Sequence, residues 1–189
     1  ESKIEGLTYI RRLCMNHPDV VAPEVQLVNI AVMQEIKNYR SQVSRVAIAA
    51  LEDLYFHMRR FMDADLDKTV QALLLKGAES NKFILSDVEH ALNVMVDSVS
   101  SSRAMLALMT EAQHKSAAVR GLITKTLVHL VDKMGPRKAL KVPQDIVEKF
   151  LRGLNRFVCD AAPDARFYGR NIVLMLVEYN KNLNKMTKF

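Results

Sequence analysis

The sequence contains no tryptophan, only two cysteines, and few of the residues that interrupt helices. Six glycines and five prolines are spread over 189 residues, so the secondary-structure elements must be long. Long elements rich in Ala, Leu, Met, Glu and Lys favour helices, because these residues have high helix propensity. With 49% hydrophobic residues, the chain can bury a substantial core. The composition therefore excludes a disordered chain and favours a helical one.

The two cysteines, Cys14 and Cys159, lie far apart, each within an expected helix, and neither a CxxC motif nor a histidine pair accompanies them. We therefore expect two buried free thiols in a reducing compartment. The sequence also lacks a signal peptide and any apolar run of about eighteen residues, which predicts no membrane segment. The chain starts without an initiator methionine, so we expect a piece of a longer protein.

Motifs for catalysis or cofactor binding are missing as well. The sequence has no G-x-S-x-G, P-loop, HExxH, GxGxxG or paired-carboxylate pattern. Its five histidines show no metal-ligand or catalytic spacing, and its ten methionines are scattered as core-filling residues would be. We expect a protein that is not an enzyme and that needs no metal or cofactor.

What the sequence does contain is a repeated pattern of apolar residues. The segments VSRVAIAALEDL, ILSDVEHALNVM, VRGLITKTLVHL and ARFYGRNIVLML carry apolar or small residues at offsets 0, +4, +7, +8 and +11. This spacing forms one buried stripe along an α-helix. The stripes are Val43, Ala47, Ala50, Leu51 and Leu54; Ile84, Val88, Ala91, Leu92 and Met95; Val119, Ile123, Thr126, Leu127 and Leu130; and Ala165, Gly169, Ile172, Val173 and Leu176. A fifth match places Gly6, Tyr9, Ile10 and Leu13 on the first helix.

These segments start about 41 residues apart on average, and a second set of expected helices lies between them, at 23–38, 65–79, 102–113 and 143–159. Paired helices at such a period are typical of HEAT-type repeats. The sequence therefore predicts an all-α HEAT-repeat α-solenoid of about nine helices in antiparallel pairs. We expect a single domain over residues 1–189 whose first pair lacks its leading helix, with MGPRKALKV as the longest irregular connection.

Short polar turns join the helices of each pair: NYRSQ at 38–42, ESNKF at 79–83, QHKSA at 113–117 and DAAPDAR at 160–166. Windows around them, 36–45, 79–88, 113–121 and 160–170, hold 40 residues and carry +4 of the net charge of +6. Because stacked repeats align their turns, we expect one basic edge that suits an acidic partner. Tyr39 and Phe83 are either apolar anchors on this edge or staples on their own helices, with the core favoured for Phe83.

The loop motifs NYRSQVSR, KFILSDVEHAL, HKSAAVRGLITKTLVHLV and DARFYGR resemble a TOG domain, the tubulin-binding HEAT array of microtubule regulators, over essentially the whole chain. The last motif, with MGPRKAL upstream, is most similar to the crescerin group of ciliary TOG-array proteins, and next to the CLASP proteins. TOG domains usually carry a tryptophan in the first loop, and the match at residues 3–7 places that loop just before residue 1.

The resemblance implies a monomeric domain whose intra-repeat turns contact the acidic surface of αβ-tubulin, as the free dimer or in the microtubule lattice. It implies a place in the cytoplasm and the cytoskeleton, at the cilium or axoneme. The implied contact residues are Asn38, Arg40, Ser41, Lys82, Phe83, Lys115, Ser116, Arg120, Asp164, Arg166 and Arg170.

Some alternatives stay open at this point. Arg120 and Arg166 either contact the partner or bind a carboxylate of a neighbouring repeat. A HEAT scaffold that binds another protein or a peptide on its helix face is the alternative function. A nucleic-acid partner is not expected, because the basic residues cluster on turns rather than along helix faces. Gly169 lies in a buried stripe, which predicts a close approach by the preceding helix.

Overall fold

The structure is a computed structural model that describes residues 2–79 and 82–186, and every regular element within these ranges is helical. Nine of these described elements are α-helices of ten residues or more. The predicted all-α fold of antiparallel helix pairs is thereby confirmed. The chain forms two compact units, Glu1–Ala104 and Met105–Phe189. That residues 1–189 make one continuous domain stays a prediction.

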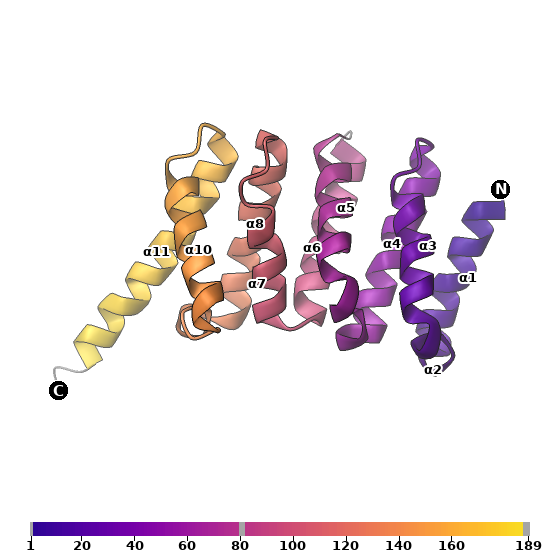
Figure 1. Ribbon diagram of the computed structural model, residues 1–189, viewed down its shortest axis with the longest axis horizontal. Helices are drawn as coiled ribbons and strands as arrows, with labels where there is room; N and C mark the ends of the chain where they lie inside the picture. Colours follow the sequence, from indigo (N-terminus) through magenta and orange to yellow (C-terminus); the bar gives the residue numbers. More distant parts are fainter. Residues whose placement is uncertain (1, 80–81, 187–189) are drawn as a thin grey trace. The chain divides into compact units, whose positions relative to one another are not determined.

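Unit 1 contains five long helices: α1 (Ser2–Asn16), α3 (Val25–Ile36), α4 (Ser41–Met58), α5 (Leu66–Ala78) and α6 (Lys82–Ser98). Short helical segments connect them, α2 (Pro18–Val21), η1 (Ala22–Glu24) and η2 (Arg59–Asp65). Helix α4 packs against α1, α3 and α6, and α5 packs against α6. Figure 1 shows the resulting pairs, α3 with α4 and α5 with α6.

Unit 2 contains the end of α7 (Ser101–Thr110), which crosses the boundary between the units, and the helices α8 (Ala117–Met134), α10 (Gln144–Val158) and α11 (Pro163–Met186). Helix α11 packs against both α8 and α10. The first residue of α11 is Pro163, whose missing N–H costs nothing at a helix start.

The predicted stripes form the core of α4, α6 and α8, where every stripe position is buried. In α11 the first three stripe residues are buried and Val173 and Leu176 are half-buried. Thr126 is tolerated inside because its hydroxyl donates to the carbonyl of Leu122 at 2.9 Å. The 3.6-residue period therefore predicts most of the core correctly.

The stripe predicted for the first helix is wrong. Gly6, Tyr9 and Leu13 are exposed, and α1 instead buries Leu7 and Cys14. In α4 the stripe is enclosed by several helices, whereas the main long-helix neighbour of α1 among the described residues is α4 alone. With one such neighbour, α1 buries a narrower face than the repeat pattern assumes.

The stretch MGPRKALKV is not wholly irregular. Gly135 adopts φ +78°, a left-handed value that suits glycine, and its N–H bonds to the carbonyl of Val131 at 2.9 Å as α8 ends. Pro136 then begins a short helix, α9 (Pro136–Ala139), which packs on α8 and α11 and buries Ala139. The burial of one alanine is too weak a signal to be seen in the sequence.

The prediction of two buried thiols is half right. Both cysteines are free, but only Cys14 is buried, and burial raises the pKa of its thiol to about 11. Cys159 is exposed because it lies beyond the end of α10, as its C-cap residue, rather than inside a helix.

Gly169 allows α11 to approach α10 closely, as predicted. A Cβ atom at this position would lie 2.9 Å from Cβ of Phe157 and 3.1 Å from its carbonyl carbon. Neither atom can move away by a change of rotamer, because one is backbone and the other is fixed to it. The glycine therefore sets the distance between the two helices.

Candidate functional site

The turn between α3 and α4 is held in one shape by Asn38. Its amide nitrogen donates to Oε2 of Glu35 at 2.8 Å, and its Oδ1 accepts the N–H of Arg40 at 2.9 Å. Its carbonyl accepts a hydrogen bond from Nζ of Lys76 on α5, at 3.0 Å. Asn38 thus both shapes the turn and ties it to the next helix pair.

The same turn displays an aromatic ring and a cation. The Tyr39 side chain is 87% exposed, and the guanidinium of Arg40 lies over its ring, 5.7 Å from the centroid. Arg40 itself and Ser41, the first residue of α4, are also exposed. The turn therefore offers charge and apolar area together.

The start of α6 lies at the same end of unit 1, as Figure 1 shows. It presents Lys82 and Phe83, both exposed, with Phe83 at 71%. The core position favoured for Phe83 is wrong, because Ile84, one residue later, takes the buried position and a helix turns by about 100° per residue. In the part of the chain that the structure describes, Arg40 and Lys82 make no ion pair.

Arg120 joins the two turns of unit 2. Its Nε and Nη2 donate to the two carboxylate oxygens of Asp160 at 2.7 and 2.8 Å, and its Nη1 donates to the carbonyls of His114 and Lys115 at 2.9 and 3.0 Å. The hydrogen bond from Arg120 holds the pKa of Asp160 below its usual value. Arg120 thus binds a carboxylate of the neighbouring repeat, while its contact with a partner stays a prediction.

Arg166 and Ser116 have structural contacts as well. The guanidinium of Arg166 donates to the carbonyls of Asp160 and Ala161. The hydroxyl of Ser116 accepts the N–H of Val119 at 3.5 Å and caps the amino end of α8. Both residues are half-buried, so they stabilise the turns rather than project from them.

The predicted contact residues therefore divide by exposure. Seven are exposed and available to a partner: Arg40, Ser41, Lys82, Phe83, Lys115, Asp164 and Arg170. Four are half-buried within the turns: Asn38, Ser116, Arg120 and Arg166. Tyr39 is not among the predicted contact residues, yet it is the most exposed of the large apolar side chains described. Its position in the middle of a short polar turn is the sequence signal for this exposure.

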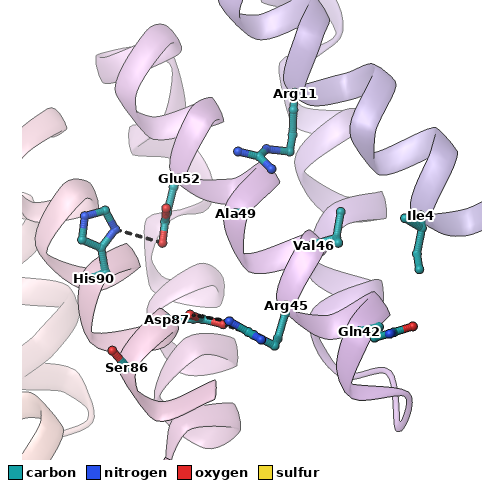
Figure 2. Close-up of a pocket in the computed structure, with 10 residues that line it drawn as sticks. All are labelled: Ile4, Arg11, Gln42, Arg45, Val46, Ala49, Glu52, Ser86, Asp87 and His90. Carbon is teal, nitrogen blue, oxygen red and sulfur yellow. Dashed lines mark hydrogen bonds and ion pairs between the residues drawn. The ribbon is translucent and has the colours of Figure 1, made fainter. Parts of the chain in front are cut away.

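A separate groove lies on a helix face of unit 1, between α1, α4 and α6 (Figure 2). Its volume is about 740 Å³, and Ile4, Val46 and Ala49 supply apolar lining. Polar side chains from the three helices surround these residues: Arg11, Gln42, Arg45, Glu52, Ser86, Asp87 and His90.

Ion pairs link adjacent helices along this groove. Arg45 donates through Nε to Asp87 at 2.6 Å, and His90 Nδ1 lies 3.1 Å from Glu52, as Figure 2 shows. Nε of Arg11 likewise donates to Oδ2 of Asp53, at 2.6 Å. Burial raises the pKa of Glu52, against the opposing effect of His90. The groove is thus a polar and apolar surface with balanced charge.

Within residues 2–79 and 82–186, no group of three or more His, Cys, Asp or Glu residues is placed to hold a metal ion. No helix in these ranges is long and apolar enough to cross a membrane.

No family model matches the sequence. It is 36% identical over 178 residues to TOG array regulator of axonemal microtubules protein 1 of Mus musculus, and the match covers 94% of this chain and 10% of that protein. The Homo sapiens protein of the same name is 37% identical over 172 residues, 88% of this chain and 10% of the relative.

A more distant relative is the crescerin-like protein che-12 of Caenorhabditis elegans, 28% identical over 176 residues, which are 92% of this chain and 14% of the relative. The chain therefore spans only about a tenth of the length of the first two relatives. Because the similarity extends over nearly all of this chain, the chain is a member of the TOG-array family, homologous to one segment of these longer proteins.

Proposed function

We propose that this chain is a non-catalytic tubulin-binding module that contributes to the regulation of axonemal microtubules. The observation that carries the proposal is the basic and aromatic edge of unit 1, where Tyr39, Arg40, Lys82 and Phe83 are exposed at one end of the helices. The names of the mammalian relatives, regulators of axonemal microtubules, supply the class of partner. A ciliary location follows from the same names.

The chemistry of this edge suits an acidic protein surface. Unpaired cations attract such a surface over a Debye length, about 10 Å at 0.1 M salt, and speed the encounter. Tyr39 and Phe83 then lose water against the partner, which contributes about 1.5–3 kcal/mol for a fully buried aromatic side chain. Tyr and Arg are also the residues most enriched among binding hot spots. We therefore expect the positive charge to favour an acidic partner and to speed association, and the burial of the aromatic rings to stabilise the complex.

Preorganisation of the turns within each unit also supports binding. Lys76 and Asn38 fix the α3–α4 turn, and Arg120 fixes both turns of unit 2 through Asp160. Ordering these turns before binding lowers the entropic cost of association. A single module that binds weakly can still contribute to overall binding, because several modules in one long protein raise the effective concentration of the partner.

The test is charge reversal at the turns of both units. We expect Arg40→Glu and Lys82→Glu in unit 1 together with Lys115→Glu in unit 2 to abolish co-sedimentation with microtubules and co-elution with unpolymerised tubulin, with the helical circular dichroism unchanged. All three side chains are exposed, so the fold should survive. Loss of co-elution alone would indicate that these residues bind unpolymerised tubulin, and loss of pelleting alone would indicate that they bind the microtubule lattice.

A matched control reverses three exposed cations outside the turns, Arg12→Glu, Arg137→Glu and Lys141→Glu. It changes the net charge by the same amount and should leave binding within about twofold, after allowance for the weaker long-range attraction. Equal losses in the two triple variants, or unaltered pelleting of the first, would contradict the proposal.

A second candidate function is attachment through the helix face of unit 1. It is favoured by the groove of about 740 Å³ that Val46 and Ala49 help to line (Figure 2), since an accessible apolar groove suits a segment of another protein. The substitution Ala49→Trp would fill the groove. Loss of microtubule binding in Ala49→Trp, combined with full binding by the turn variant, would favour the helix face over the turns.

A further inference from the structure

A second groove lies in unit 2, between the carboxyl end of α7 and one face of α10. Its volume is about 340 Å³. Met109 and Ala112 of the α7 side and Gly153 of α10 are buried and form its apolar base. Thr110 and Gln113 line the α7 side with polar groups. The groove shares no residue with the turn residues proposed to contact tubulin.

Three cations of α10, Lys149, Arg152 and Arg156, line the other side of the groove, and all are exposed. In the described part of the chain, the side chains of Lys149 and Arg156 make no hydrogen bond or ion pair. Among the residues described, Arg152 pairs only with Glu148, at 3.0 Å, and both side chains are at least half exposed. Such an exposed ion pair contributes little to stability, so Arg152 can release the carboxylate of Glu148 and bind another anion.

The acidic residues of these elements offset only part of this charge. Glu148 is engaged by Arg152, Asp145 lies at the amino end of α10 away from the lining set, and Glu111 has contacts of its own and does not line the groove. The lining residues therefore carry three positive charges and no negative one.

The spacing of the cations fits an extended chain. Along a helix, three and four residues correspond to rises of about 4.5 and 6 Å. In an extended peptide, side chains on the same face repeat about every 6.7 Å. Carboxylates at alternate positions of an extended acidic peptide can therefore meet Arg152 and Arg156 in turn, with the longer, flexible Lys149 reaching a third.

We propose that this groove of unit 2 is a binding site for an extended acidic peptide segment, with the carboxylates on Lys149, Arg152 and Arg156 and the peptide backbone beside Thr110 and Gln113. Arginine forks pair with carboxylates through two hydrogen bonds. None of the described residues that line the groove is aromatic, whereas sites for single-stranded nucleic acid stack bases on such rings. A peptide therefore fits this site better than a nucleic acid does.

The experiment uses the full chain and a fluorescein-labelled octapeptide of glutamate, followed by fluorescence anisotropy. We expect saturable binding that weakens as salt rises. The variant Lys149→Gln, Arg152→Gln and Arg156→Gln should reduce the affinity at least about tenfold, as loss of a few charge-assisted hydrogen bonds predicts. The octapeptide of glutamine should not bind.

Two controls separate this site from general charge and from the turn edge. The variant Arg137→Gln, Lys138→Gln and Lys141→Gln removes the same charge from exposed positions elsewhere in unit 2 and should change the affinity less than about twofold. The turn variant Arg40→Glu, Lys82→Glu and Lys115→Glu should bind the peptide with a salt dependence like that of the original chain.

Several outcomes would overturn the proposal: no saturable binding, equal losses in the two glutamine variants, or tighter binding of an eight-nucleotide DNA strand through the same three cations. If the chain binds tubulin but not the peptide, this inference alone is rejected. If the chain binds the peptide but not tubulin, the proposed function is rejected and the peptide site in the groove is retained.

Discussion

Gly169 shows how one missing side chain sets a helix contact. Alanine has a higher helix propensity than glycine by about 1 kcal/mol, yet a Cβ here would lie 2.9 Å from Cβ of Phe157. We expect Gly169→Ala to lower the free energy of unfolding by about 1–3 kcal/mol, because α10 and α11 must separate. Chemical denaturation followed by circular dichroism measures this change.

Gly6 provides the matched control for this prediction. It lies within α1, is exposed, and has no atom within 4 Å of the position of an added Cβ. Gly6→Ala should therefore raise the free energy of unfolding by about 0.5–1 kcal/mol through helix propensity alone. If both substitutions stabilise the protein, the close approach at Gly169 is not a constraint.

At the scale of elements, the Arg120–Asp160 pair predicts a dependence of stability on pH. The pKa of Asp160 is lowered in the folded state, so its contribution is complete above the ordinary aspartate pKa of about 4 and is lost as the pH falls through the folded value. Asp160→Asn should cost about 1–3 kcal/mol at pH 7. The cost should shrink toward pH 2, as measured by urea denaturation across this range.

Asp145→Asn serves as the comparison, since Asp145 is exposed and has no ion pair among the residues described. Its unfolding free energy should stay within about 1 kcal/mol of that of the original chain at pH 7, since an exposed charge in the first turn of a helix contributes at most about this much. A pH profile of Asp160→Asn that runs parallel to that of the original chain would show that the pair contributes no charge-dependent stability.

The sequence predicts elements whose signals are local and misses features that depend on distant neighbours. The stripes of α4, α6 and α8 repeat at the helical period, and they are buried throughout. The face of α1 and the short helix α9 depend on which helices pack beside them, which no local pattern specifies. The stripe includes Ile84, which is buried, and leaves out Phe83, which is exposed, so the period is a better guide to Phe83 than its apolar character.

In the candidate sites, too, the sequence predicts features with local signals and misses those that depend on residues far away in the chain. Turn positions predict the exposure of Arg40, Lys82 and Lys115 correctly. The structural role of Arg120 could not be assigned from the sequence, because its partner Asp160 is 40 residues away. The cations of α10 are visible in EKFLRGLNRF at i, i+3 and i+7, but the sequence does not place them beside α7.

For the whole molecule, the net charge of +6 predicts how binding to tubulin responds to salt. The Debye length falls from about 10 Å at 0.1 M to about 3 Å at 1 M ionic strength. We expect the affinity for tubulin to fall roughly tenfold between 0.05 and 0.3 M salt, because rim charges act over these distances. Co-sedimentation across a salt series measures the slope.

Tyr39→Ala separates the two contributions in this series. It should lower the affinity by a similar factor at every salt concentration, leaving the slope unchanged, because apolar burial is not screened by salt. A slope that flattens in Tyr39→Ala would mean that the ring acts mainly by positioning Arg40, whose guanidinium lies over it.

The ion pairs between helices also bear on how damage at one site spreads along the repeats. Arg11 and Asp53 are 42 residues apart, as are Arg45 and Asp87, and Arg120 and Asp160 are 40 apart. Each pair therefore spans about one repeat and joins one repeat to the next. Loss of a single pair should weaken one junction between neighbouring repeats and leave the other junctions intact, because each repeat contacts only its neighbours.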